Sequence, residues 1–408
     1  MSSVIVLGSG AIGLCCAHYL HGEGLEVTIV DRDAPGMGCS WGNAGMLTPS
    51  HFVPLAAPGM VAQGLKWMFD GASPFYIRPR LDLDLMRWLW HFNRAATPAR
   101  MERAMPLLRD MSQTSLGLFH ELAPMDFGLM EQGLVMYFNS EKGRRGCLHE
   151  IELAHRIGVE ARLLDVPQLR ELEPEARVKA LGGVFFPGDA QLDPGLFSAA
   201  MTANLAQKGV TFLRKEGRGF RLESGRLRAL RTDEGDLAAD TFILAAGCWS
   251  ALLAKEAGLP LPLQAGKGYS FDYAEPPLGL RLPSILTEAR VAMTPMGGRL
   301  RIAGTMELAG VDLRINPVRV EAIRRAVPRY FEVEMPAAPD PVWSGLRPCS
   351  PDGLPFIGPF TKVPNLIAAT GHAMLGITLA PITGRLVADL VTGRKPSLEM
   401  DLLSPDRF

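Results

Sequence analysis

A glycine-rich turn near the start of the chain has the residue types that bring a backbone close to phosphate groups. Gly8, Gly10 and Gly13 form the pattern GxGxxG. The first glycine of such a turn permits a sharp bend, the second lets the backbone approach a pyrophosphate, and the third lets the following helix pack closely on the strand. Asp31 stands near the position, about 20 residues further on, where an acid accepts hydrogen bonds from ribose hydroxyls. The turn therefore predicts a dinucleotide site, and the acid disfavours NADP because it would repel a 2′-phosphate.

The elements around this turn complete a βαβ unit. A β-branched apolar run at residues 4–7 precedes the glycines, an Ala/Leu-rich segment at 11–21 has helical spacing, and a second apolar run at 25–30 ends at the acid. The helix would direct its free N–H groups at the phosphates. NAD and FAD share this adenosine pyrophosphate half, so the unit alone does not separate them. The following segment, residues 32–59, is rich in Gly, Pro, Ser and Asn, and a loop of this length is uncommon unless it serves a site.

Five sequence blocks, in this order, resemble one family. They are "GSGAIG" with Asp31, "CSWGNAGML" with "PLAAPG", "KGYS", "GLRPCSPDGLPFIG" and "ATGHAMLGITLAPITGRLVADL". Together they resemble the D-amino-acid oxidase superfamily of flavoproteins, most of all its bacterial D-amino-acid dehydrogenases, with glycine oxidase more distant. The resemblance covers nearly the whole chain and is weakest at about residues 80–180.

The resemblance implies an extended, non-covalently bound FAD. Besides the glycines and the acid, the loop after Asp31, the end of a buried strand near Gly247, and a loop and helix start near His372 would surround it. A helix beginning there would direct its positive end at the pyrimidine side of the flavin, where the reduced ring collects negative charge. The cofactor-binding residues expected in this way are Gly8, Ser9, Gly10, Ile12, Gly13, Asp31, Arg32, Ser40, Asn43, Ala44, Gly45, Met46, Leu47, Gly247, Gly371, Met374, Leu375, Gly376, Ile377 and Thr378.

Arg347, in the "GLRP" block, matches the carboxylate-binding arginine of the family. Its planar guanidinium can make two parallel hydrogen bonds to a carboxylate, although without the motif a structural arginine is the simpler reading. The other two residues expected at the catalytic centre are Tyr269 and His372. Tyr269 would contribute a hydroxyl, or else "KGYS" is only a strand turning into the substrate domain. His372 is more simply a histidine hydrogen-bonded beside the flavin than a general base.

The resemblance implies FAD-dependent oxidation of a D-amino acid, linear or cyclic, such as D-proline or 4-hydroxy-D-proline. Electrons would pass to a membrane quinone or another acceptor. Where glycine oxidases carry an aromatic contact, this chain has Arg290 and Ala292, which argues against that assignment. The alternatives are an oxygen-using glycine or sarcosine oxidase, an NAD-linked dehydrogenase, and a dinucleotide-binding partner protein without catalysis.

The expected fold is α/β, with a discontinuous Rossmann-like FAD-binding domain and an α+β substrate domain built on a mixed sheet. The FAD-binding domain is assigned residues 1–80, 146–262 and 340–408, and the substrate domain 81–145 and 263–339. A helix-rich stretch over 81–121 is expected to be broken at Pro98 and Pro106.

Composition narrows the remaining possibilities. The net charge of −1 comes with dispersed Lys and Arg, so the chain has no patch for nucleic acid. Its six cysteines form no CxxC pair and have no histidine at metal-ligand spacing, which favours buried thiols and a cytoplasmic location without a metal site. The segment "LMRWLWHF" is either a core or interdomain helix or a patch that docks peripherally on the inner membrane or a partner. No feature specifies an oligomeric state.

Overall fold

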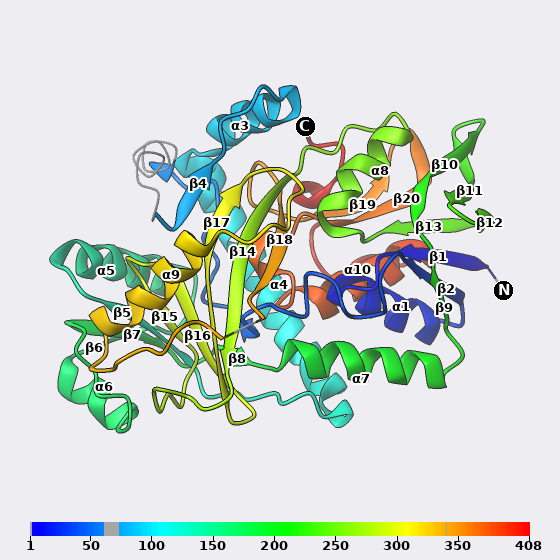
Figure 1. The fold of residues 1–408 in the computed structure, drawn as a ribbon. Helices are drawn as coiled ribbons and strands as arrows, with labels where there is room; N and C mark the ends of the chain where they lie inside the picture. The colour runs from blue at the N-terminus through cyan, green and yellow to red at the C-terminus, as the bar shows by residue number, and fades with distance from the viewer. Residues whose placement is uncertain (1, 61–72, 340) are drawn as a thin grey trace.

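A six-stranded sheet organises one half of the molecule, drawn on the right of Figure 1. The computed structural model describes residues 2–60, 73–339 and 341–408. Within them the strand order is β19-β20-β13-β1-β2-β9, and every neighbouring pair is parallel except β19 with β20. The strands are β1 (Ser3–Leu7), β2 (Glu26–Asp31), β9 (Thr211–Arg214), β13 (Thr241–Leu244), β19 (Phe356–Phe360) and β20 (Val363–Thr370). The predicted Rossmann-like fold is confirmed.

Both faces of this sheet are buried, as the continuous apolar run of β1 requires. Val4 and Val6 pack into a core under helices on one face, whereas Ile5 and Leu7 pack into a second core on the other. The first face is covered by α1 (Ala11–Gly22), α4 (Pro98–Leu122), α7 (Pro194–Gln207) and α10 (Ala380–Val391). The second is covered by α8 (Ser250–Glu256) and a small antiparallel sheet of β10 (Gly217–Glu223), β11 (Arg226–Thr232) and β12 (Gly235–Ala238).

The other half is built on a nine-stranded mixed sheet, which also confirms its prediction. The order among the described residues is β18-β14-β17-β16-β15-β5-β7-β6, with β4 paired to β17. The strands are β4 (Phe75–Ile77), β5 (Leu134–Phe138), β6 (Arg162–Leu164), β7 (Gly182–Phe186), β14 (Gln264–Tyr273), β15 (Ser284–Leu286), β16 (Val291–Met296), β17 (Arg299–Leu308) and β18 (Trp343–Cys349). Helices α5 (Glu141–Arg156), α6 (Val166–Leu172) and α9 (Pro317–Ala326) pack around it (Figure 1).

The remaining elements lie outside these two large sheets. The two-residue strands β3 (Met46–Leu47) and β8 (Ala190–Gln191) pair with each other, and α3 (Leu83–Ala95) lies at the top of Figure 1. The 3-10 helices are η1 (Ala123–Met125), η2 (Gly247–Trp249), η3 (Val327–Arg329), η4 (Ala373–Leu375) and η5 (Asp401–Leu403).

Strand pairing groups the chain differently from the predicted domain boundaries. Strands β4, β6, β7 and β18 lie within segments assigned to the FAD-binding domain, yet each pairs in the nine-stranded sheet. Helix α4, assigned to the substrate domain, packs on α10 beside the six-stranded sheet. The domain division at residues 81, 146, 263 and 340 stays a prediction. By strand pairing, the chain passes between the two sheets at other positions.

The predicted break at Pro106 is wrong. Pro98 begins α4, where its missing N–H costs nothing, and Thr97 caps the helix by accepting a hydrogen bond from the backbone N–H of Arg100 at 3.4 Å. Pro106 lies inside the helix, which continues to Leu122. The buried side chains on either side of it pack into the core, and that burial offsets the lost backbone hydrogen bond.

Candidate active site

A cavity of about 610 Å³ lies where the two halves meet. One part of its lining comes from the carboxyl ends of β1, β2 and β13 in the six-stranded sheet, and another from β18 of the nine-stranded sheet. The carboxyl ends of parallel strands are where open α/β sheets bind their ligands. The cavity therefore joins the predicted dinucleotide turn to the predicted carboxylate-binding strand.

The glycine turn has the close contacts that its sequence predicts. Gly8 has φ +106°, and a Cβ atom there would lie 2.5 Å from the carbonyl oxygen of Ala245 in the neighbouring strand segment. A Cβ atom on Gly13 would lie 1.9 Å from the carbonyl oxygen of Gly8. Asp31 accepts hydrogen bonds at Oδ2 from the backbone N–H and hydroxyl of Ser9, at 2.7 and 2.8 Å. Only glycine fits at positions 8 and 13, and Asp31 also fixes the turn.

The loop after Asp31 is held along the cavity by both halves. Ser40 accepts a hydrogen bond from the first backbone N–H of α1, that of Ala11, at 3.1 Å. The guanidinium of Arg301, on β17, donates to the carbonyl oxygens of Trp41 and Asn43 at 3.0 and 2.8 Å. The loop therefore has a defined path beside the start of α1.

Arg347 presents a half-buried guanidinium to this cavity. Its only side-chain hydrogen bond within the described residues goes from Nη1 to the carbonyl oxygen of Thr305, at 2.9 Å. No carboxylate of those residues pairs with it, and desolvation lowers its pKa. A guanidinium in this state gains strongly from a carboxylate ligand, because charge-assisted bidentate hydrogen bonds are strongest away from water.

His372 lines the cavity as a neutral imidazole. It is 3% exposed, and burial lowers its pKa to about 3. Nε2 lies 2.9 Å from the hydroxyl oxygen of Thr383, whereas the buried Nδ1 has no partner within the described part of the chain. An imidazole of this pKa is too weak a base to hold a proton at neutral pH, so it serves as a hydrogen-bonding group.

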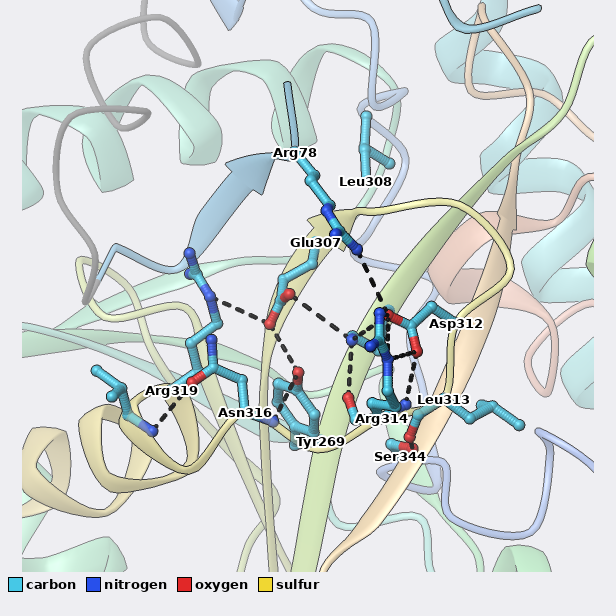
Figure 2. Close-up of polar contacts among 12 residues, drawn as sticks. Arg78, Tyr269, Glu307, Leu308, Asp312, Leu313, Arg314, Asn316, Arg319 and Ser344 are labelled. Atoms are coloured by element: carbon cyan, nitrogen blue, oxygen red, sulfur yellow. Dashed lines mark hydrogen bonds and ion pairs between the residues drawn. The ribbon is translucent and has the colours of Figure 1, made fainter. Parts of the chain in front are cut away.

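Tyr269 lies on the opposite face of β14 from Arg347. A Cβ atom on Gly268 would lie 2.2 Å from Nη1 of Arg347, and alternation along the strand turns Tyr269 the other way. Its hydroxyl donates to Glu307 at 2.7 Å and accepts from the backbone N–H of Asn316 at 3.3 Å (Figure 2). Tyr269 is 1% exposed and does not line the cavity. The structure therefore does not bring it together with Arg347 and His372.

The predicted site residues divide into a lining set and a supporting set. Those that line the cavity are Gly8, Gly10, Ile12, Asp31, Arg32, Ser40, Asn43, Gly247, Arg347, His372, Gly376 and Ile377. Those that do not are Ser9, Gly13, Ala44, Gly45, Met46, Leu47, Tyr269, Gly371, Met374, Leu375 and Thr378. Members of the second set can hold the lining in place: Ser9, for example, donates from its backbone N–H and its hydroxyl to Asp31, at 2.7 and 2.8 Å.

The predicted helix start near His372 is displaced along the chain. Gly371 and Ala373 have positive φ values of 83° and 48°, and a 3-10 turn over Ala373–Leu375 follows. The α-helix, α10, begins only at Ala380. The backbone must first turn out of β20, so the helix N-terminus lies after the "GHAMLG" block rather than within it.

Sequence reasoning missed part of the lining. Trp249 follows Gly247 and stacks under Arg32, whose guanidinium carbon lies 4.1 Å from the ring centroid. Its place two residues after the predicted turn at Gly247 could have identified Trp249 as a lining residue from the sequence. Residues 215–218, Leu313 and Trp343 also line the cavity. They stand in loops and strand ends without a motif, so the sequence alone offered no signal for them.

The lining fits an extended FAD. Two glycines keep the turn free of side chains at the N-terminus of α1, where phosphates bind favourably. The buried Nδ1 of His372 and the guanidinium of Arg347 supply polar groups at another part of the same cavity. No cluster of His, Cys, Asp and Glu among the described residues could hold a metal ion.

A family model of FAD-dependent oxidoreductases, DAO, matches residues 3–390. The chain belongs to this family. As a DAO-family enzyme it is an FAD-binding flavoprotein oxidoreductase, which confirms the family, the cofactor and the enzyme class expected from the sequence blocks.

The relatives of this DAO-family chain span its full length. It is 35% identical to a D-amino acid dehydrogenase of Granulibacter bethesdensis, with 99% of both chains covered. Among solved structures it is similar to glycine oxidase from Geobacillus kaustophilus, with a TM-score of 0.79, 25% identity and all of both chains covered. L-proline dehydrogenase from P.horikoshii has the same fold, with a TM-score of 0.75, 18% identity, and 100% of this chain and 97% of that one covered.

Within the described ranges, none of the helices of this DAO-family chain combines the length and the apolar character needed to cross a bilayer.

Proposed function

We propose that the enzyme oxidises the carbon–nitrogen bond of a D-amino acid. One observation carries the proposal: the guanidinium of Arg347, without a carboxylate partner in the described chain, faces the same cavity as the dinucleotide turn. Relatives named D-amino acid dehydrogenase, one of them 35% identical over the full length, support the substrate class and its handedness.

In this proposal, Arg347 clamps the substrate carboxylate with two parallel hydrogen bonds and so fixes the α-carbon. The glycine turn, Asp31, the loop from Ser40 to Leu47 and the residues around Gly247 and Gly371 hold the cofactor. Bound FAD would supply the acceptor for the hydride of the α-carbon. His372 is too weakly basic to take the ammonium proton at neutral pH, so the amine gives its proton to solvent before the bond to hydrogen breaks.

The product is an imine, and its fate depends on the substrate. A linear imine hydrolyses to a 2-oxo acid and ammonia, whereas D-proline or 4-hydroxy-D-proline gives a ring imine. Both substrate types are included because the chain has Arg290 and Ala292 where glycine oxidases carry an aromatic contact, a departure that argues against a pocket specific for glycine. Anaerobic bleaching of the flavin by a panel of D- and L-amino acids, including both cyclic compounds, ranks them.

Substitution of Arg347, the residue proposed to bind the substrate carboxylate, tests the proposal. Arg347→Met removes the charge at similar length, and we expect kcat/KM for the best D-amino acid to fall about 100-fold or more while bound FAD is kept. Arg347→Lys keeps the charge without the fork and should recover only part of the loss. An Arg347→Met enzyme with wild-type kcat/KM would contradict the proposal.

We propose a quinone as the electron acceptor and a cytoplasmic enzyme that docks peripherally on the inner membrane. Helix α3 buries Leu85 and Trp88 and exposes Met86 and Trp90, with basic side chains beside them. It therefore packs on the protein and also offers an apolar surface, which suits a membrane interface. Turnover with a soluble quinone analogue, and co-sedimentation with anionic vesicles that is lost in Trp90→Ala, would support this. The structural similarity to glycine oxidase favours the alternative, oxygen, and stoichiometric peroxide without added quinone would establish it.

We also propose that FAD is bound without a covalent link. Cys349 is the last residue of β18, the strand that carries Arg347, but it is fully buried, and burial raises its pKa to about 12. A protonated thiol is a poor nucleophile. Acid precipitation should therefore release all of the yellow colour into the supernatant, and colour that stays with the pellet would show a covalent link.

A further inference from the structure

A segment between β17 and α9, residues 309–316, is fastened by side chains of the nine-stranded sheet. Its backbone is bound at three points: the hydroxyl of Ser344 donates to the carbonyl oxygen of Leu313 at 2.5 Å, Nζ of Lys267 donates to that of Arg314 at 2.8 Å, and the backbone N–H of Asn316 donates to the hydroxyl of Tyr269 at 3.3 Å (Figure 2). Ser344 lies on β18, the strand that carries Arg347. Lys267 and Tyr269 lie on β14, which pairs with β18.

Two of the anchors, Lys267 and Tyr269, belong to a buried network of charged and polar side chains. Lys267 is 3% exposed, and its Nζ lies 3.8 Å from a carboxylate oxygen of Glu307 and 3.8 Å from one of Asp312. Glu307 is in turn 3.1 Å from Nε of Arg319 and accepts the hydroxyl of Tyr269. Burying charges is costly unless each is paired, and here every charge has an opposite partner. Lys267 is the member that joins the sheet network to the segment.

Asp312 shapes the segment locally. Its carboxylate accepts from the backbone N–H of Arg314 at 2.9 Å and from the guanidinium of that residue at 3.0 Å. These hydrogen bonds hold the pKa of Asp312 far below its ordinary value. The turn is therefore charged and closed at every physiological pH, and it fixes the direction of Leu313 between the two residues.

Leu313 is what the segment contributes to the cavity. Its side chain lines the cavity together with Trp343 and Ser344, and it remains 44% exposed to solvent. Val311, two residues earlier, is exposed to a similar degree, 47%, but does not line the cavity. Because Leu313 both lines the cavity and is partly exposed to solvent, we place it at the mouth of the cavity. Contact with a bound ligand would remove more of its surface from water.

We propose that Leu313 closes the mouth of the FAD cavity and slows release of the cofactor, and that Lys267 is a positioning residue that holds Leu313 there. The inference rests on FAD binding and not on the identity of the amino-acid substrate. It also gives Tyr269 a role: through Glu307 and Asn316 it positions the 309–316 segment and does not touch the substrate.

Release of FAD measures this directly. The holoenzyme is diluted into a large volume of buffer so that released FAD does not rebind, and the rise of free-flavin fluorescence gives the dissociation rate. Leu313→Ala should release FAD about tenfold faster than wild type, the factor that corresponds to about 1.4 kcal/mol. Val311→Ala, an equal truncation two residues away, should release it at the wild-type rate. A wild-type rate in Leu313→Ala, or equal acceleration in both variants, would overturn the proposal.

The positioning role has its own variants. Lys267→Met, which removes the charge and keeps an unbranched side chain only one atom shorter, should accelerate release as Leu313→Ala does. If the buried network does not tolerate that change, Tyr269→Phe loosens the segment at Asn316 with minimal change of volume, and it should accelerate release while kcat at saturating substrate is kept. A Tyr269→Phe enzyme with normal release and a large loss of kcat would restore the catalytic reading of this residue. If the wild-type enzyme did not oxidise D-amino acids, the FAD release measurement would still be valid. The proposal on Leu313 and the proposal on the substrate can therefore fail independently.

Discussion

Gly268 has no Cβ atom and so leaves room for the guanidinium of Arg347. A Cβ atom there would lie 2.2 Å from Nη1 of Arg347, so Gly268→Ala must displace the guanidinium. We expect kcat/KM for the D-amino acid to fall by up to about 100-fold, mostly through KM, because a shift of about 1 Å in a positioning group can cost that much. Steady-state kinetics and FAD content measure the change.

Gly266 offers the control for Gly268. A Cβ atom at Gly266, two residues earlier on the same strand, would meet the side chains of Cys349 and Met306 at 3.0 and 3.3 Å, not the guanidinium. Gly266→Ala should therefore cost stability more than KM. Equal KM values for the two variants would show that the clamp does not depend on Gly268.

Single residues were predictable where one motif carries the chemistry. The glycine turn with Asp31, and Arg347 in its block, all lie on one cavity. Tyr269 could not be placed, because its block fixes a strand but not which face of that strand looks at the cavity. The decisive fact is the pair Gly268 and Arg347, which lie far apart in the sequence and touch only through the pairing of β14 with β18.

At the scale of elements, the fit of α1 on β1 decides whether the phosphate site exists. A Cβ atom on Gly13 would lie 1.9 Å from the carbonyl oxygen of Gly8, which is backbone and cannot rotate away. Gly13→Ala should therefore push the start of α1 off the strand and yield protein with little bound FAD. The ratio of absorbance at 450 nm, a wavelength at which flavins generally absorb, to protein concentration measures it.

The other end of the same helix provides the comparison. A Cβ atom on Gly22, the last residue of α1, would have no neighbour within 4 Å. Gly22→Ala should keep full FAD content and gain up to about 1 kcal/mol in helix stability. If both variants lost FAD equally, close packing at Gly13 would not be the reason.

Elements were predictable where periodicity is local, and less so where packing overrides it. The strand, helix and strand at the N-terminus are found as predicted. Pro106 does not break α4, because burial of its neighbours outweighs the loss of one hydrogen bond. The start of α10 was predicted too early in the chain, because the backbone first turns at Gly371 and Ala373 and the helix begins only after that turn.

For the whole molecule, the class of each sheet was predictable but the route of the chain between them was not. Alternation of residues after position 265 predicted a mixed sheet, which the structure confirms. The same alternation does not say that β5 joins β15, or that β6 and β7 follow β5 in this sheet, since those pairings are set by contacts between distant segments. The predicted domain boundaries do not follow these pairings for the same reason, and they stay a prediction.

A buried acid where β8 meets the loop after β3 links stability of the whole fold to pH. Asp189 is 2% exposed, accepts from the backbone N–H of Ser50 at 3.0 Å and from its hydroxyl at 2.5 Å, and has its pKa raised to about 7 by burial. Its neighbours include Glu150, which raises that pKa further, and His51, whose Nδ1 lies 3.1 Å from the hydroxyl oxygen of Ser50. Between about pH 4 and pH 7 the native state therefore holds a proton that the unfolded chain has lost.

Because the folded-state pKa is raised, the stability that this proton confers is present below pH 4 and is lost as pH rises through 7, by at most about 1.4 kcal/mol per pH unit. Asp189→Asn removes the charge, still accepts from the backbone N–H of Ser50 through its amide oxygen, and can donate from its amide NH2 to the hydroxyl oxygen of Ser50. Its melting temperature relative to wild type should therefore be higher at pH 8 than at pH 5, measured by thermal unfolding of the holoenzyme. Asp401→Asn, at an exposed carboxylate, should show the same difference at both values. A pH-independent difference for Asp189→Asn would mean that this carboxyl group is already ionised at pH 5 in the folded protein.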